Sequence, residues 1–157
     1  FTVGKNLPIN AFKLPTSTNL ISVKSVKHQI FVELVGRVSS IKLNFPVASD
    51  VITPDMQLAL QRIHQNLIQL NTLADDLELS FGLVIMGSSD NSGNKVSNTI
   101  LSLQIAQNTE KALQQLGINK DQMFVTGLGQ VELIEIENTS RNVLFNILYA
   151  RKESLMK

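Results

Sequence analysis

Hydrophobic positions along the chain recur with two spacings, and the order of these spacings predicts a mixed α/β domain. Apolar and polar residues alternate in three runs, 41–45, 77–86 and 143–149, which is typical of β-strands. Val84 and Met86 make the end of the second run apolar on both faces. That pattern indicates a central strand covered by helices.

Between the first two runs, apolar residues recur at spacings of three and four, which predicts a helix with one face against a core. Thr53-Pro54-Asp55 is typical of a helix start, with a capping hydroxyl, a proline in the first turn and an acid near the positive helix end. The pattern ends at Asn71-Thr72. Asp75-Asp76 indicates a solvated turn, because too few oxygen ligands converge there for a metal site.

A second helix is predicted from about Lys95 to Leu116, with Gly117 as its capping residue. A short strand is expected at 123–126, a turn at 127–129 and a further strand at 131–136. The residues of the second helix expected to face the sheet are Leu103, Ala106 and Leu113.

The first 26 residues lack periodicity, and two interpretations of them remain open. They contain two prolines, are rich in Asn, Ser and Thr, and carry three lysines without an acid, which favours an extended linker. Their scattered aliphatic and aromatic residues also fit an arm that lies on a neighbouring protein. The β-branched and aromatic run 30–35 predicts a strand added before the first alternating run.

A sharp polar turn is predicted at Gly87–Gly93, where small residues follow the central strand and precede the second helix. Seven consecutive Asn, Ser, Asp and Gly residues favour local backbone hydrogen bonds and positive φ. A strand that leads into a helix N-terminus collects free backbone N–H groups at the positive end of the helix dipole. Such a place suits a carboxylate.

Together these elements predict an α/β two-layer sandwich, with two helices on one face of a mixed sheet. The predicted division of the chain is an extended arm over 1–26, a domain over 27–150 that includes the added strand, and a charged tail over 151–157.

Composition excludes several classes of function. The 157 residues have a formal net charge of +1 and no cysteine, so nothing favours nucleic acid, a disulfide framework or a thiol nucleophile. No cofactor or metal site is predicted. The two histidines, His28 and His64, are far in sequence from the polar turn, and no hydrolase elbow or phosphate loop is present, so no enzyme is predicted.

The stretch 87–129 resembles the C-terminal peptidoglycan-binding domain of the OmpA family. About forty residues match in register without a gap. The matching positions are Gly87, Asp90, Gly93, Asn98, Leu101, Ser102, Ala106, Leu113, Gly117, Ile118, Gly127 and Gly129. The resemblance implies an OmpA-like fold and a site for the diaminopimelate residue of the peptidoglycan stem peptide.

The resemblance also implies a two-residue clamp, half of which is missing here. In the family, the residue matching Asp90 takes the ligand ammonium, and an arginine fifteen residues later takes the ligand carboxylate through a bidentate fork. This chain has Ile105 at the arginine position. Leaving a buried charge without its partner costs on the order of 3–5 kcal/mol, or about two to four decades of affinity.

The sequence therefore predicts a degenerate site that has lost its binding of diaminopimelate. In the alternative, peptidoglycan binding is retained, and Lys95 or Arg141 pairs with the ligand carboxylate. Ile105 itself is either one more core residue or part of an apolar contact patch. The final loop is shorter than in the family and keeps only one of its arginines, at Arg141. The candidate residues are Asp90, Asn91, Gly93, Asn98, Ser102, Ile105 and Arg141.

These features predict a non-enzymatic structural component of a Gram-negative envelope assembly. Degenerate domains of this kind occur in lipoproteins of secretion machines, including type IV secretion systems. We therefore expect a periplasmic protein associated with the outer membrane, through a lipid anchor upstream of Phe1. The expected partners are other envelope or secretion-complex proteins, with peptidoglycan binding weak or lost.

Overall fold

A computed structural model describes residues 16–46, 49–89, 95–130 and 141–152. The longer elements in order are α1 (Thr16–Ser39), β1 (Lys42–Phe45), α2 (Pro54–Leu77), β2 (Leu79–Ser89), α3 (Lys95–Gln115), β3 (Met123–Gln130) and β4 (Arg141–Arg151). A short 3₁₀ helix, Lys120–Gln122, leads into β3. The predicted strand at 131–136 lies outside the described residues.

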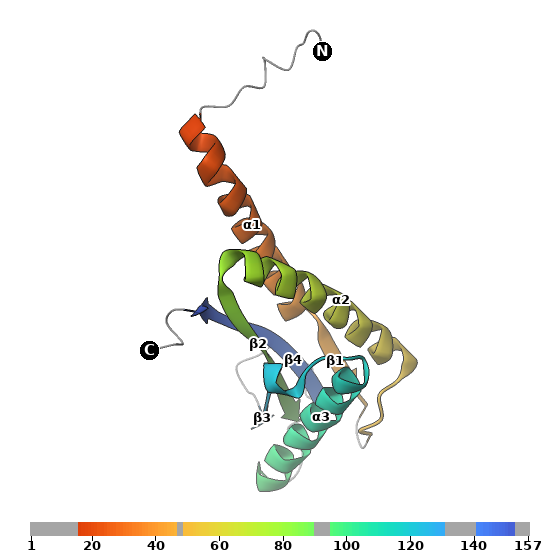
Figure 1. Cartoon of the computed structure of the whole chain (residues 1–157). Coiled ribbons are helices and arrows are strands. Elements are labelled where there is room, and N and C mark those ends of the chain that lie inside the picture. Colours follow the sequence, from red (N-terminus) through yellow and green to blue (C-terminus); the bar gives the residue numbers. More distant parts are fainter. Residues whose placement is uncertain (1–15, 47–48, 90–94, 131–140, 153–157) are drawn as a thin grey trace.

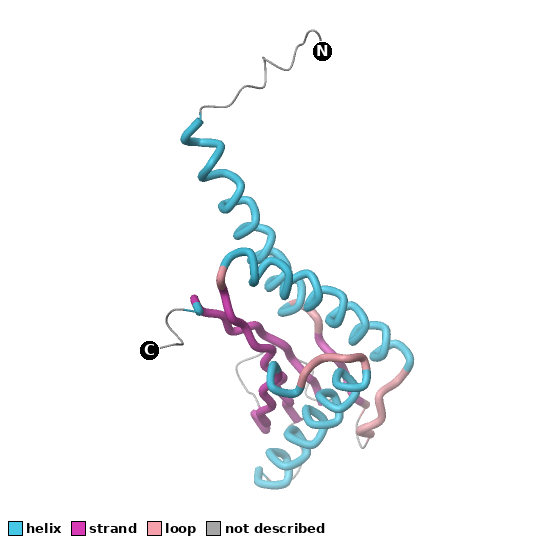
Figure 2. Tube along the Cα trace, viewed as in Figure 1, coloured by secondary structure: helices cyan, strands magenta, loops and turns pink. Residues whose placement is uncertain are grey.

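The strands form one mixed sheet in the order β1-β4-β2-β3. β4 is antiparallel to both of its neighbours, whereas β3 is parallel to β2. The helices α1, α2 and α3 contribute to a single buried cluster with one face of this sheet (Figure 1 and Figure 2). The predicted α/β sandwich is confirmed, with one more helix than the sequence indicated.

The N-terminal part of the domain is a helix where the sequence favoured a strand. The predicted strand 30–35 is wrong, because these residues belong to α1, which also includes residues 16–26 of the expected extended arm. Phe31, Leu34 and Val38 are buried at helical spacing, while Val32 is exposed. The boundary expected after residue 26 therefore falls within a helix.

One aromatic cluster fixes α1 to the sheet. The Phe31 ring is fully buried, with its centroid 4.9 Å from that of Tyr149 on β4 and 6.2 Å from that of Phe81 on β2. Both pairs meet edge to face, an arrangement that adds to the free energy gained from burial alone. Helical structure places Phe31 over these two strands. Packing thus determines the secondary structure of residues 30–35, whose β-branched composition is ambiguous.

The α2 helix begins as predicted but ends later. The Thr53 hydroxyl oxygen accepts a hydrogen bond from the Met56 amide at 3.2 Å, and Pro54 is the first helical residue. The helix continues past the predicted end at Asn71-Thr72, because Ala74 extends its buried face. Its last turn therefore holds the acid pair that was expected in a turn.

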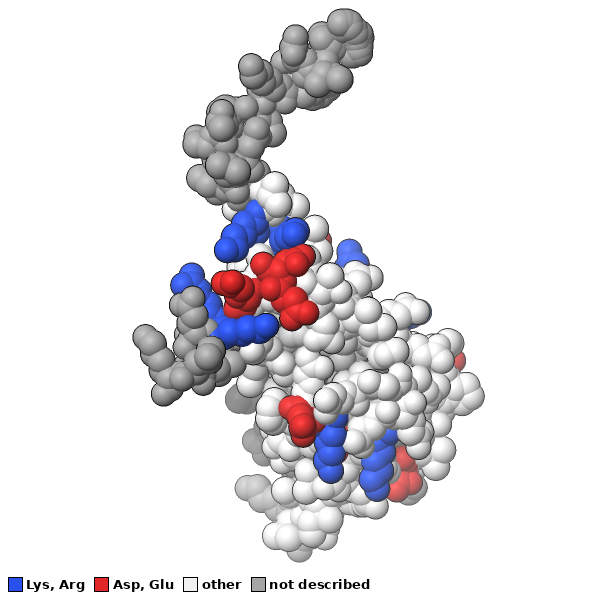
Figure 3. Space-filling view, in the orientation of Figure 1, with Lys and Arg blue, Asp and Glu red and all other residues white. Residues whose placement is uncertain are grey.

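The acids at the end of α2 connect three elements. Asp76 pairs with Lys27 of α1 at 3.1 Å, and Asp75 pairs with Lys152, which follows β4, at 3.6 Å. Figure 3 shows acidic and basic side chains mixed where α1 leaves the rest of the domain. Each exposed pair contributes little on its own, so the burial of Phe31, Leu34 and Val38 in the core remains the main attachment of α1.

The residue that caps α2 is under backbone strain and offers a test of this helix end. Glu78 has a φ of 57°, in the left-handed region, and its amide donates to the Ala74 and Asp75 carbonyl oxygens. Glu78→Gly should raise the free energy of unfolding by about 0.5–1 kcal/mol, because glycine adopts this conformation without a side-chain clash.

The comparison for this test is Gly117, which follows α3 with a φ of 112°. Gly117→Ala should lower the free energy of unfolding, because alanine rarely adopts a positive φ. Urea denaturation of both variants and of the unmodified chain measures the two changes. If Glu78→Gly is instead destabilising, the described helix end is incorrect.

Candidate ligand site

The helix α3 lies unusually close to the sheet because two glycines leave room for it. A Cβ atom on Gly87 of β2 would overlap the Ser102 carbonyl oxygen, and one on Gly127 of β3 would lie 2.7 Å from the Leu103 amide nitrogen. The predicted turns at 87–89 and 127–129 are wrong, since these residues continue β2 and β3. Both glycines are required for close helix packing.

Most of the buried polar side chains of the described residues gather where α3 crosses this end of the sheet. Ser88 and Ser89 end β2, and its neighbour β4 begins with Arg141-Asn142. The Ser88 hydroxyl donates to the Asn142 carbonyl oxygen at 3.4 Å. The full group, which we call the polar cluster, consists of Ser88, Ser89, Asn98, Ser102, Arg141 and Asn142.

The helix α3 contributes two members of the polar cluster from one face. Asn98 and Ser102 are four residues apart, so their side chains project on the same side of the helix. Asn98 is 4% exposed and Ser102 is fully buried, with its hydroxyl donating to the Thr99 carbonyl oxygen at 2.8 Å. Both were predicted as site residues from the sequence, and the fold brings them to the ends of β2 and β4.

Arg141 is the charged member of the polar cluster. It begins β4 opposite Phe45 of β1, and only 8% of its surface is exposed. Within the described ranges, its guanidinium has neither an ion-pair nor a hydrogen-bond partner. Its nitrogen atoms are not among the fully buried polar atoms that lack a partner, so the guanidinium reaches the surface of the described residues. An arginine fork there can receive a carboxylate through two parallel hydrogen bonds.

Ile105 is a core residue in the structure. Its side chain is fully buried together with Ala106 and Leu113. The alternative in which Ile105 forms an apolar contact patch is therefore wrong, because no part of this side chain reaches the surface. The prediction that Leu103 faces the sheet is also wrong, since Leu103 is 36% exposed.

Three predicted site residues, Asp90, Asn91 and Gly93, lie outside the described part of the chain, so their roles stay predictions. Ser88, Ser89 and Asn142 were not predicted as site residues, because the local sequence pattern favours a turn at the two serines. Extending the alternating pattern of residues 77–86 to Ser89 would have placed both serines at the end of a strand.

Comparison with known protein families matches residues 44–143 to the OmpA family. The chain belongs to the OmpA family. This match begins within β1, covers α2, β2, α3 and β3, and ends near the start of β4. The polar cluster thus lies within the part of the chain that the family defines.

Solved structures of other OmpA-like domains share the fold. The peptidoglycan-associated lipoprotein from Burkholderia pseudomallei is 23% identical with a TM-score of 0.56, over 68% of this chain and 89% of that one. The C-terminal domain of Helicobacter pylori MotB is also 23% identical, with a TM-score of 0.53 over 74% of this chain and 88% of that one. A comparison with curated proteins gave no match.

In the described ranges, no group of three or more His, Cys, Asp or Glu side chains is arranged to hold a metal ion. None of the helices described has the length and hydropathy of a membrane-spanning segment.

Close packing of α3 can be tested by adding one methyl group. Gly87→Ala should lower the free energy of unfolding by about 1–3 kcal/mol or more, because the new Cβ cannot fit unless α3 moves away from the sheet. Chemical denaturation followed by circular dichroism measures this. Gly36→Ala in α1 is the matched control, since nothing lies within 4 Å of its new Cβ.

The control should be stabilised by up to about 1 kcal/mol, because alanine favours the helix over glycine. Equal effects of the two substitutions would contradict the close contact of α3 with Gly87.

The assignment of Ile105 to the core makes a separate prediction. Ile105→Ala should cost about 2–5 kcal/mol of unfolding free energy, through lost burial and a residual cavity. Ile100→Ala on the same helix should change it by less than about 0.5 kcal/mol, because Ile100 is 60% exposed. Thermal unfolding of both variants tests this, and a neutral Ile105→Ala would place residue 105 at the surface.

Proposed function

We propose that this OmpA-family chain is a non-enzymatic structural component of a Gram-negative envelope assembly, acting through contacts with other proteins. The observation that carries the proposal is the complete burial of Ile105. The family resemblance calls for a guanidinium at that position, whereas this chain places an aliphatic side chain in the core. The site then lacks the cation that would grip the diaminopimelate carboxylate.

The loss is large in energetic terms. A carboxylate that enters a closed site without its partner forfeits on the order of 3–5 kcal/mol. As the sequence predicts, Asp90 would still pair with the ligand ammonium. The ligand carboxylate would have no cationic partner at position 105. We therefore assign this domain at most weak binding of peptidoglycan.

The finer proposal concerns the assembly. We propose that the chain serves a secretion machine of the type IV class, in the periplasm and attached to the outer membrane by a lipid anchor. One structural neighbour is itself named a lipoprotein. The helix α1 supports a docking role, because its first half extends beyond the domain with Val23 and Val26 exposed (Figure 1).

Arg141 favours a second candidate, in which peptidoglycan binding is retained. Its guanidinium has no partner in the described residues, and Arg141 belongs to the same polar cluster as Asn98 and Ser102. An arginine can receive a carboxylate in bidentate fashion, which Lys95 could not do. In this candidate the anion-binding role has moved from position 105 on α3 to the start of β4.

Isothermal titration of the full chain with a stem peptide that contains diaminopimelate separates the two candidates. The structural role predicts no saturable heat at micromolar peptide concentrations. Retained binding predicts micromolar affinity that Asp90→Ala abolishes and that Arg141→Met weakens by about two decades or more.

Arg37→Met on α1 is the matched control for Arg141→Met, because Arg37 is exposed and belongs to another face of the domain. Micromolar binding that survives Arg37→Met and is lost in Asp90→Ala would overturn the first proposal. Circular dichroism confirms that each variant is folded.

A further inference from the structure

A hollow opens beside the sheet where β3 begins later than its neighbour β2. Pairing between these strands starts at Leu83 and Met123, so residues 79–82 of β2 have no partner on β3. Residues 80–82 line the hollow, together with the turn that leads into β3 and the end of β4. Its volume of about 480 Å³ lies in the range of ligand-binding pockets.

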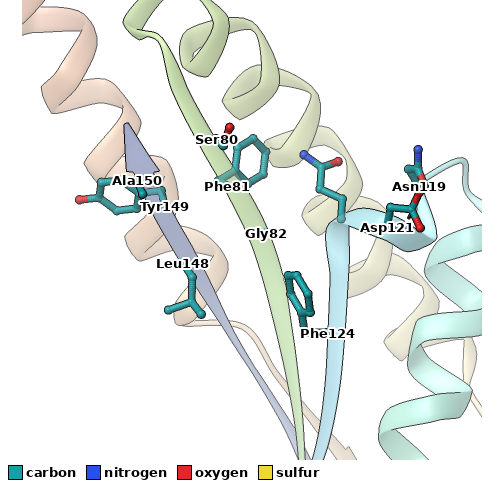
Figure 4. A pocket seen from close by; sticks show the side chains of 10 residues that line it. Ser80, Phe81, Gly82, Asn119, Asp121, Phe124, Leu148, Tyr149 and Ala150 are labelled. Atoms are coloured by element: carbon teal, nitrogen blue, oxygen red, sulfur yellow. Dashed lines mark hydrogen bonds between the residues drawn. The ribbon is translucent and has the colours of Figure 1, made fainter. Parts of the chain in front are cut away.

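One side of the hollow is apolar. Phe124 is 55% exposed and Leu148 is 60% exposed. Gly82 lies against the Phe124 ring, because an added Cβ there would be 2.5 Å from a ring carbon. Figure 4 shows Phe124 with Leu148 on one side and with Asn119 and Asp121 on the other. The hollow thus runs from an apolar end to an acidic end.

The charge of the hollow is negative. Asp121 is the only charged residue among the described residues that line it. It is exposed and forms no ion pair within the described ranges. The bases next to the lining in sequence, Lys120 and Arg151, are not part of it, and Lys42 lies on β1, which β4 separates from β2. Charge complementarity therefore favours a cationic occupant.

An arginine side chain matches both ends of this hollow. Its aliphatic stem lies along apolar surface while its head stays charged. Its planar guanidinium stacks on an aromatic ring and donates two parallel hydrogen bonds to a carboxylate. Lysine carries a compact and strongly hydrated charge, so it gains less from the Phe124 ring.

We propose that this hollow binds an exposed arginine side chain of a partner protein. The guanidinium pairs with Asp121, and the stem lies across Phe124 toward Leu148. The site involves neither the polar cluster nor α1. It rests on the proposed function, because it names the chemistry of one contact with another protein.

An NMR titration of the full chain with a blocked glycine-arginine-glycine tripeptide tests this proposal. The backbone amide resonances of Gly82 and Phe124 should shift saturably, with a dissociation constant in the millimolar range because a single exposed contact is weak. The same peptide with citrulline in place of arginine should bind about two- to fivefold more weakly, since citrulline has a similar shape but no charge.

Asp121→Asn should weaken binding of the arginine peptide about two- to fivefold and leave binding of the citrulline peptide unchanged. Asp121 is exposed, so this change leaves the core intact. Asp50→Asn is the matched control, because Asp50 is an exposed acid outside the lining of the hollow. It should leave both dissociation constants unchanged.

The proposal fails if the arginine peptide gives no saturable shift, if the citrulline peptide binds equally well, or if Asp121→Asn has no larger effect than Asp50→Asn. Shifts of the same amides when the chain alone is concentrated would assign the hollow to a second copy instead. Titration with stem peptide is read separately, so this site and the proposed function can fail independently.

Discussion

The close contact of α3 with the sheet at Gly87 and Gly127 determines the rest of this structure. Without Cβ atoms at these positions, the helix backbone at Ser102 approaches β2 and β3 directly. That approach buries Ile105 and Ala106 in the core and holds Asn98 and Ser102 against the strand ends. A single packing constraint thus fixes both the hydrophobic core and the polar cluster.

The molecule separates its buried polar side chains from its exposed apolar ones. Buried polar groups gather where β2 ends and β4 begins, whereas the outer face near Gly82 exposes Phe124 and Leu148. Buried polar groups are expensive unless they are satisfied, and exposed aromatic groups gain little from water. The exposed apolar side chains favour contacts beyond the isolated chain, and they lie in a different part of the fold from the polar cluster.

Much of the fold follows from the sequence, because periodicity and capping chemistry agree in α2, β2 and α3. The failures have physical causes. In α1, β-branched residues suggested a strand, whereas tertiary packing favours a helix that buries Phe31, Leu34 and Val38 on one face and brings Phe31 against Phe81 and Tyr149. Local propensity also predicts turns at Gly87 and Gly127, since a sequence does not reveal that a glycine faces a helix. Asn98, Ser102 and Arg141 were predictable from the family resemblance alone.

Under the proposed function, this domain no longer binds the anionic end of the stem peptide tightly. The most direct test follows the guanidinium N–H resonance of Arg141 by NMR while a diaminopimelate-containing muropeptide is added to the full chain. If tight binding is lost, the chemical shift of this resonance should not change at micromolar ligand. A saturable shift of that resonance, absent when the ligand carboxylate is amidated, would contradict it.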